Sequence, residues 1–182
     1  MNRVRTGELP WTKLDRLHRM ILDRLLNDFH ITGLSEPEVE DLNRVWHRLR
    51  PWPDAVSGLT RLKKRFTIAP LSNGNVSLMT DLAKHSGLPW DCILGAELVR
   101  HYKPDPEVYL SAAEFLDVMP AEVMMVAAHL TDLGAAKKSG LVTGFVPRPL
   151  EFGPSGKPDL KPASFVDLVA KDFNDLSMQL GV

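Results

Sequence analysis

The feature that most constrains the fold of this chain is a regular alternation of helices and short buried strands that begins at residue 54. The pattern predicts helices at 54–64, 75–87, 106–117, 131–139 and 172–180, and strands at 66–71, 91–95, 122–127, 141–146 and 165–170. Strands that alternate with helices form parallel sheets, because each helix returns the chain to the same end of the sheet by a right-handed crossover. The sequence therefore predicts a doubly wound α/β core built on a parallel sheet.

Two helices are predicted before this core. Leucine and isoleucine recur at helical spacing in the first helix, and Ser35 with Glu38 forms a capping box that begins the second. Two prolines within three residues then stop the helix and stiffen the connection. We therefore expect two units, a partial helical cap at residues 1–50 and the α/β core at residues 51–182.

Composition excludes several classes of partner. The chain has 22 basic and 23 acidic residues and no long run of either sign, so we expect neither nucleic acid nor a membrane surface as a partner. Cys92 is the single cysteine, and no Cys/His spacing suggests a metal site. No apolar stretch approaches the ~20 residues of a membrane span, and no secretory leader opens the sequence. We expect a cytoplasmic protein without a metal or cofactor.

One loop holds a lysine in a stiff setting. Pro104 and Pro106 bracket Asp105, so Lys103 is held extended and a helix begins at about Pro106. Tyr109 then lies one turn inside that helix and faces back toward the lysine. A cation on a rigid loop beside a helix start suits an anionic ligand, although a solvated lysine would give the same local pattern.

Polar side chains follow two of the predicted strands. Ser72 and Asn73 come after the strand at 66–71, and His129 and Asp132 come after the strand at 122–127. Open α/β sheets bind ligands at the carboxyl ends of their strands. Each of these residues alone could be a turn, a cap or a helix-start charge, and their joint placement is what predicts a site.

Together these segments, Leu-Ser-Asn-Gly-Asn, Tyr-Lys-Pro-Asp-Pro-Glu-Val-Tyr and Ala-Ala-His-Leu-Thr-Asp, resemble the haloacid dehalogenase-like superfamily, and most closely its 2-haloacid dehalogenase branch. The resemblance covers nearly the whole chain, with three motifs in the family's order. It implies a metal-independent, cofactor-free hydrolase, dimeric when complete. Such an enzyme removes halide from a short (S)-2-haloacid and gives the 2-hydroxyacid through an aspartyl ester.

The resemblance also implies a role for each site residue. Lys103 matches the lysine that orients the nucleophile, Asp132 the acidic residue that holds this lysine, and Tyr109 a tyrosine beside it. Ser72 and Asn73, with backbone N–H groups at a helix start, match the position that binds the substrate carboxylate. His129 replaces an asparagine of the family and could donate a hydrogen bond or act on water.

The family's nucleophile has no counterpart here. It is an aspartate in an Asp-x-x-Gly-Thr motif at the end of the first core strand, and no aspartate of this chain has that setting. We therefore expect the first core strand to be missing and this chain alone to be inactive. The arginine that binds substrate carboxylate is expected to be missing too, with Arg3 and Arg5 as the nearest candidates.

Two other functions stay open. Phosphatases of the same superfamily carry two aspartates in the last motif that help to hold Mg²⁺, and Ala128 stands here at the first of these positions. This substitution disfavours phosphatase chemistry. The third possibility is a non-catalytic truncated fragment or binding module that keeps the fold without the nucleophile.

Overall fold

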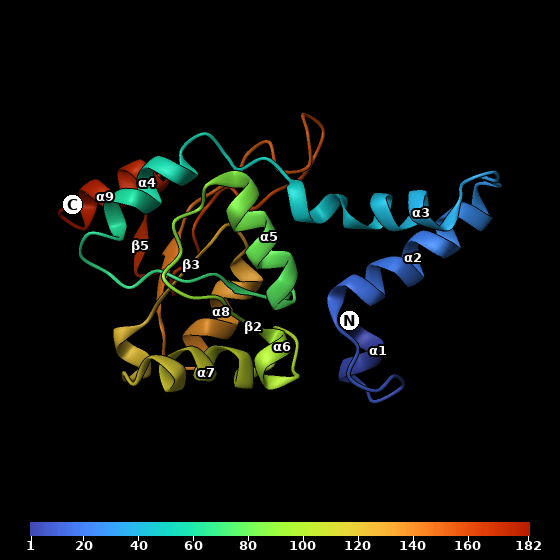
Figure 1. The fold of residues 1–182 in the computed structure, drawn as a ribbon. Helices are drawn as coiled ribbons and strands as arrows, with labels where there is room; N and C mark the ends of the chain where they lie inside the picture. Colours follow the sequence, from blue (N-terminus) through green and yellow to red (C-terminus); the bar gives the residue numbers. More distant parts are fainter.

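The computed structural model describes residues 1–182 as a mixed α/β fold (Figure 1). Its helices are α1 (Asn2–Arg5), α2 (Leu14–Asp28), α3 (Glu36–Asn43), α4 (Ala55–Leu62), α5 (Val76–Ser86), α6 (Ala96–Val99), α7 (Pro106–Leu116), α8 (Leu130–Lys138) and α9 (Phe173–Gln179), with 3₁₀ helices η1 (Arg44–Arg48) and η2 (Pro120–Glu122). Its strands are β1 (Leu71–Ser72), β2 (Leu94–Gly95), β3 (Met124–Ala127), β4 (Val142–Phe145) and β5 (Leu168–Val169).

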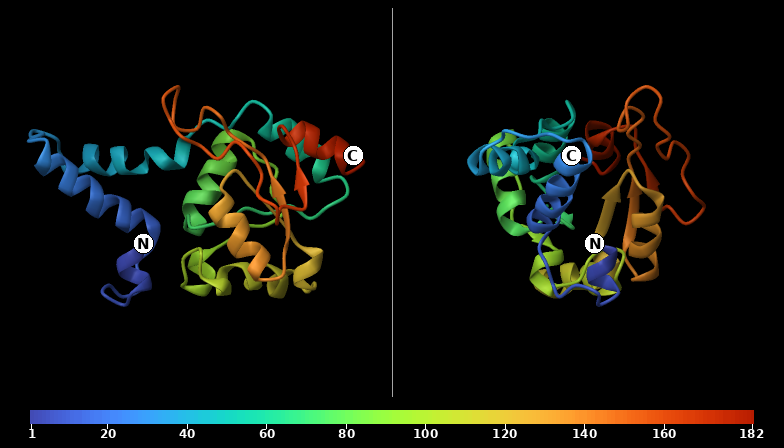
Figure 2. Two further views of the ribbon diagram at one scale, coloured as in Figure 1. Left: turned by 180° about the vertical axis from the view of Figure 1, so that it is seen from behind. Right: turned by 90° about the vertical axis from the view of Figure 1, so that its right-hand side faces the viewer.

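All strand pairs are parallel, which confirms the predicted fold class. The strands form two separate sheets, one of order β1-β2 and one of order β3-β4-β5. No strand lies between β1 and β3, so each of these strands keeps one edge unpaired. The helices pack on both sides of the strands, as a doubly wound fold requires (Figures 1 and 2).

The first sheet is shorter than the sequence predicted. The expected strand at 66–71 is a strand only at its end, because Pro70 has no N–H to donate and this segment has a single neighbour. Gly95 lets β2 approach β1 closely, since a Cβ at this position would lie 2.5 Å from the carbonyl oxygen of Ser72. Helix α6, which follows at once, was not predicted.

The largest cluster of buried apolar side chains lies where α4 and α9 pack against the second sheet. Leu59 and Leu62 from α4 contact Leu176 from α9 and Val146 beyond β4. A smaller cluster joins α7 and α8 through Tyr109 and Ala136. These two clusters hold the ends of β3 and β4 in place.

Helices α2, α3 and η1 form a hairpin that projects from the rest of the molecule (Figures 1 and 2). The predicted capping box is confirmed, with the Ser35 N–H donating to Glu38 Oε2 at 2.7 Å. At the base of the hairpin, Leu17 packs on Tyr102 and Ala96. No helix has the length and apolar content to cross a membrane.

Candidate active site

Lys103 lies in the loop before α7, and Pro106 opens this helix as the two prolines predicted. Its side chain is 11% exposed, and its Nζ donates to Asp132 Oδ2 at 2.9 Å. The Tyr109 hydroxyl donates to the other oxygen of the same carboxylate at 2.6 Å. Lys103 Nζ also lies 5.3 Å from the centre of the Tyr109 ring, so Tyr109 faces back to the lysine as expected.

Burial dominates the electrostatics of this group. It lowers the pKa of Lys103, while the neighbouring Asp132 acts in the opposite direction. Burial, and then the hydrogen bond to Asp132, raise the pKa of Tyr109 far above its ordinary value, so the phenol stays protonated. The result is one ammonium and one carboxylate held together in a largely dry setting, where their charges act strongly on a bound ion.

The loop after β1 is fastened to the lysine loop. Asn73 Oδ1 accepts the backbone N–H of Lys103 at 2.8 Å, a contact between residues thirty positions apart. Ser72 Oγ accepts the N–H of Gly74 at 3.0 Å, and the Val76 N–H donates to Glu97 Oε2 at 2.7 Å. Two backbone N–H groups that the helix start was expected to offer to a substrate are therefore already engaged. The Ser72 hydroxyl remains as a donor, and the Asn73 amide, whose Nδ2 donates to Met1 Sδ at 3.3 Å, keeps one further N–H.

His129 is placed differently. Its Nε2 pairs with Glu151 at 3.0 Å, its ring stacks on Phe152, and its side chain is 48% exposed. The structure thus brings Lys103, Asp132, Tyr109 and Asn73 into direct contact, and turns His129 toward the loop after β4. Glu151 was missed in the sequence, because nothing local marks a carboxylate 22 residues away as a partner.

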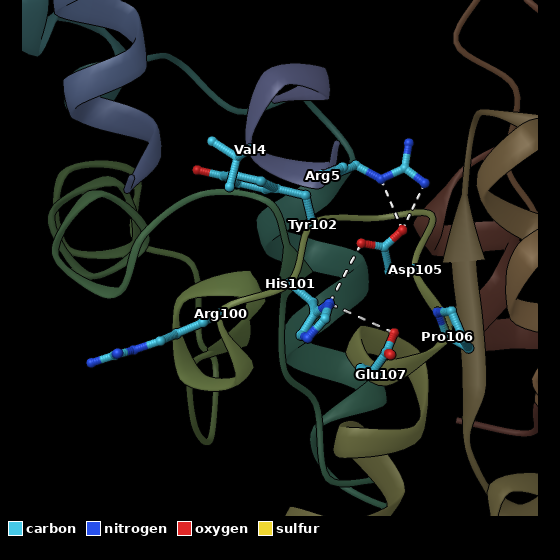
Figure 3. A pocket seen from close by; sticks show the side chains of 8 residues that line it. All are labelled: Val4, Arg5, Arg100, His101, Tyr102, Asp105, Pro106 and Glu107. Atoms are coloured by element: carbon cyan, nitrogen blue, oxygen red, sulfur yellow. Dashed lines mark hydrogen bonds and ion pairs between the residues drawn. The ribbon is translucent and has the colours of Figure 1, made fainter. Parts of the chain in front are cut away.

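The two arginines considered for a substrate carboxylate are engaged elsewhere. Arg5 donates to Asp105 Oδ1 at 2.6 Å, and Arg3 pairs with Glu8 at 3.3 Å. Figure 3 shows Arg5 over Asp105 in a surface pocket, with His101 between Asp105 and Glu107. Asp105 occupies the N-cap position of α7 as predicted, but its carboxylate binds Arg5 and makes no hydrogen bond to the helix. No group of three His, Cys, Asp or Glu side chains is placed to hold a metal ion.

Comparisons with known proteins agree with this geometry. The family model described as haloacid dehalogenase-like hydrolase matches residues 3–140. The chain is 37% identical over 123 residues to (S)-2-haloacid dehalogenase 1 of a Pseudomonas species (strain CBS-3), a match that covers 64% of this chain and 54% of that protein. It is 36% identical over 152 residues to (S)-2-haloacid dehalogenase 4A of Burkholderia cepacia, covering 78% and 65%.

Among solved structures, the L-2-haloacid dehalogenase PA0810 superimposes with a TM-score of 0.97 at 50% identity, over 100% of this chain and 79% of that one. The chain spans about half the length of the first curated relatives that it matches. The family match and the superposition cover the lysine loop and both strand ends that carry the site. The chain therefore belongs to the haloacid dehalogenase-like hydrolases.

Proposed function

We propose that the protein to which this chain belongs hydrolyses a short (S)-2-haloacid to halide and the (R)-2-hydroxyacid. The observation that carries the proposal is the buried Lys103 ammonium, held 2.9 Å from Asp132 beside Ser72 and Asn73, at the carboxyl ends of β1 and β3. A fixed cation with two neutral hydrogen-bond donors suits a reaction between two carboxylates. It offsets their mutual repulsion, and the donors orient the substrate.

The reaction proceeds in two displacements. A carboxylate nucleophile forms a C–O bond to the carbon next to the substrate carboxylate while the C–halogen bond breaks, and halide leaves with the bonding pair. Water then attacks the carbonyl carbon of the ester, which releases the hydroxyacid, restores the carboxylate and gives one proton to solvent. In this scheme Lys103 stabilises the nucleophile, Asp132 and Tyr109 hold Lys103, and Ser72 and Asn73 bind the substrate carboxylate. His129, held by Glu151, is the candidate to donate a hydrogen bond or to act on water.

The nucleophile is proposed to come from outside residues 1–182. Within the chain, Lys103 Nζ contacts a single carboxylate, Asp132, which is already bound by two donors. The free edges of β1 and β3 flank the site and offer pairing to one further strand. A strand placed there would bring its last residue between Ser72 and the end of β3, within reach of Lys103.

Metal-independent action is part of this proposal. Asp132 is neutralised by the Lys103 ammonium and accepts from Tyr109, so a divalent cation at this carboxylate would have to compete with the ammonium. Ala128 removes the second carboxylate that the phosphatases of the superfamily carry at this loop. Phosphatase activity is therefore the alternative that a metal requirement would favour.

We further propose a cytoplasmic homodimer in which residues 1–50 act as the cap and residues 51–182 as the core. The hairpin carries exposed apolar side chains that a second copy of the chain would cover: Met20, Ile21, Leu25, Phe29, Leu42, Val45, Trp46 and Leu49. Cys92 is a free thiol without a possible internal disulfide, as expected in a reducing compartment. The net charge of −1 gives no support for a nucleic-acid partner.

The test is halide release from 2-chloropropionate by two proteins. One is the chain of residues 1–182, and the other carries an added amino-terminal strand that ends in the nucleophilic aspartate. We expect release above background only from the second protein, without added metal and in the presence of a chelator. Halide release by residues 1–182 alone would refute the claim that these residues lack the nucleophile. A strict Mg²⁺ requirement, with phosphate ester cleavage, would favour the phosphatase. Inactivity of both folded proteins on every haloacid and phosphate ester tried would favour the binding module.

A further inference from the structure

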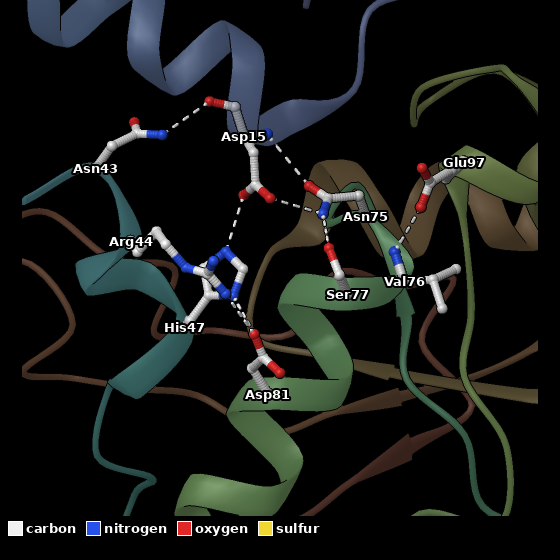
Figure 4. Close-up of polar contacts among 9 residues, drawn as sticks. All are labelled: Asp15, Asn43, Arg44, His47, Asn75, Val76, Ser77, Asp81 and Glu97. Atoms are coloured by element: carbon white, nitrogen blue, oxygen red, sulfur yellow. Dashed lines mark hydrogen bonds and ion pairs between the residues drawn. The ribbon is translucent and has the colours of Figure 1, made fainter. Parts of the chain in front are cut away.

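The start of α2 bonds to both loops of the candidate active site. Residues 12–15, which we call the base segment of the hairpin, lie where α2 meets the core. Asn75 Nδ2 donates to Asp15 Oδ2 at 2.8 Å, and Asn75 Oδ1 accepts the backbone N–H of Asp15 at 3.1 Å (Figure 4). Asn75 follows Asn73 by two residues, so these two bonds tie the hairpin to the loop after β1.

The Asn75 side chain serves this tertiary contact instead of its own helix. It occupies the N-cap position of α5, where an asparagine oxygen commonly accepts a backbone N–H of the first helical turn. Here it makes no such bond, and its Nδ2 also contacts Ser77 Oγ at 2.8 Å. The residue is 1% exposed, so leaving one of its polar atoms without a partner would cost free energy. The contact with Asp15 is therefore specific in distance and direction.

Asp15 is itself held from the opposite end of the hairpin. His47 in η1 places Nε2 3.2 Å from Asp15 Oδ1, and its Nδ1 lies 2.8 Å from Asp81 Oδ2 on α5. Asn43 Nδ2 donates to the carbonyl oxygen of Asp15 at 3.2 Å. The partner of Asn75 therefore has a fixed place where both ends of the hairpin meet α5 (Figure 4).

The base segment also holds the lysine loop. Tyr102 directly precedes Lys103, is 1% exposed and donates through its hydroxyl to the carbonyl oxygen of Thr12 at 2.7 Å. The centre of its ring lies 4.8 Å from the centre of the Trp11 ring. Burial, more than any neighbouring charge, raises the pKa of Tyr102 to about 12, so the phenol keeps the proton that this bond needs.

We propose that the base segment aligns the two loops of the site, with Asn75 as the positioning residue of the substrate-binding loop and Tyr102 as the positioning residue of the lysine loop. The loops are also bonded to each other, through Asn73 and the Lys103 N–H at 2.8 Å. A shift of the hairpin would therefore displace the groups that bind substrate and the ammonium that stabilises the nucleophile. The inference rests on the proposed function, which assigns these tasks to the two loops.

The two positioning residues should have different kinetic signatures in halide release from 2-chloropropionate by the protein with the added strand. Asn75→Ala should raise KM about tenfold or more and change kcat little, because Ser72 and Asn73 bind the substrate carboxylate in the ground state and in the transition state alike. Tyr102→Phe should lower kcat about threefold to tenfold and change KM little, because Lys103 acts on the nucleophile as the new bond forms. Loss of stability alone would not divide the two constants in this way.

A paired swap and a control variant separate positioning from stability. Asp15→Asn combined with Asn75→Asp swaps amide and carboxylate, so the amide at position 15 can donate to the carboxylate at position 75. That carboxylate can still accept the backbone N–H, and we expect KM to return to within about threefold of the wild-type value. Thr143→Val in β4 removes buried hydrogen bonds to Asp167 that involve neither the base segment nor the two loops. It should lower the melting temperature and leave KM and kcat unchanged.

Hydrogen exchange gives a readout that does not depend on the reaction. The Lys103 N–H, which bonds to Asn73, should exchange about tenfold faster in Asn75→Ala and in Tyr102→Phe, relative to α9 on the far side of the core (Figure 1). Thr143→Val should keep the wild-type ratio, and the paired swap should return to it.

Several outcomes would overturn the alignment by the base segment. A wild-type exchange rate at Lys103 in Asn75→Ala or in Tyr102→Phe would remove that residue from the proposal. The same kinetic changes in Thr143→Val, or no recovery in the paired swap, would reduce the contacts to a contribution to stability. If no protein released halide, wild type included, the proposed function would fail, and the exchange rates would still decide whether the base segment aligns the loops.

Discussion

At the scale of single residues, Lys103 and Asp132 form an ion pair that serves the chemistry of the site more than the stability of the fold. Burial lowers the pKa of Lys103, which means that the folded chain holds a charge at a cost. The carboxylate of Asp132 offsets this cost, and Tyr109 completes its hydrogen bonds. Such pairs stabilise a fold little compared with neutral side chains of similar shape, so a chemical role is the better reason for their presence.

This gives a prediction for a double-variant cycle. Lys103→Met should lower the free energy of unfolding by about 1–3 kcal/mol, because it leaves Asp132 partly buried with one donor. Adding Asp132→Asn should restore most of that loss, since the amide oxygen still accepts from Tyr109. Both variants should lack halide release in the protein that carries the nucleophile. Lys103→Arg should also release little halide, because the planar guanidinium does not replace the compact ammonium. Chemical denaturation and halide release measure these effects. Near-normal turnover in Lys103→Met would show that the lysine is only structural.

At the scale of elements, α4 and α9 approach each other closely. Gly58 lies in α4, and a Cβ added there would clash with Phe173 in α9. Alanine is normally better than glycine inside a helix by about 1 kcal/mol. At Gly58 the clash reverses this preference, because backbone and Cβ atoms cannot move aside as the tip of a flexible side chain can.

Two matched substitutions test this reversal. Gly58→Ala should destabilise the chain by about 1–3 kcal/mol by separating α4 from α9. Gly134→Ala, inside α8, meets only ordinary contacts with Phe165 at 3.5 Å, and should be neutral or stabilising by up to about 1 kcal/mol. Thermal unfolding of the two variants compares them directly. Equal effects at the two sites would contradict the close approach of α4 and α9.

The pairing of β4 with β5 depends on one carboxylate. The Lys137 ammonium, followed by the N–H and hydroxyl of Thr143, lowers the pKa of Asp167 to about 2. A carboxylate with a lowered pKa stabilises the fold above its unfolded value of about 4, and this stabilisation is lost as pH falls toward 2. Asp167 thus ties β4 and β5 to the end of α8.

We therefore expect the melting temperature of the wild-type chain to fall more steeply between about pH 5 and pH 3 than that of Asp167→Asn. The amide cannot ionise, so this variant should be less stable at pH 5 and approach the wild type at pH 3. Glu114→Gln, at an exposed carboxylate without an ion-pair partner, serves as the control and should keep the wild-type slope. If the melting temperature fell equally steeply with pH in all three proteins, Asp167 would not have this role.

At the scale of the whole molecule, the division of the strands into two sheets is the main weakness of residues 1–182. The free edges of β1 and β3 leave backbone donors and acceptors without strand partners. A buried unpaired group costs about 1–3 kcal/mol, and a domain of this size has only about 5–15 kcal/mol of net stability. Unpaired strand edges can also form hydrogen bonds with strands of other molecules.

We expect residues 1–182 alone to unfold broadly and to associate as concentration rises. The protein with the added strand should unfold in one sharp transition. Calorimetry and size-exclusion chromatography of both proteins make the comparison. A sharp transition from a monomeric chain of residues 1–182 would show that the two sheets need no further strand.

The apolar face of the hairpin leads to a separate prediction for the protein with the added strand. It should elute as a dimer, and Leu25→Glu in α2 should shift it to a monomer by placing a charge in the contact between copies. Leu150→Glu alters a leucine outside the hairpin that is more exposed, at 66% against 41% for Leu25, and should leave the dimer intact. If the wild-type protein were a monomer, the apolar face of the hairpin would not be a dimer contact. If both variants dissociated the dimer, the contact between copies would not be specific to the hairpin.

The elements that depend on neighbours along the chain could be predicted from the amino-acid sequence. The capping box at Ser35, the start of α7 at Pro106 and the alternation of strands with helices are set within a few residues, because proline geometry, caps and apolar periodicity are local. The contact of Lys103 with Asp132 was expected from the resemblance, which implies an acidic residue that holds this lysine.

The tertiary structure alone decided the contacts between distant segments. The pairs Arg5–Asp105, His129–Glu151 and His47–Asp81 join residues 100, 22 and 34 positions apart, and no local pattern indicates that the two members of a pair meet. Local chemistry determined which secondary structure each segment of this protein can adopt. Packing between distant segments determined which charged side chains form pairs.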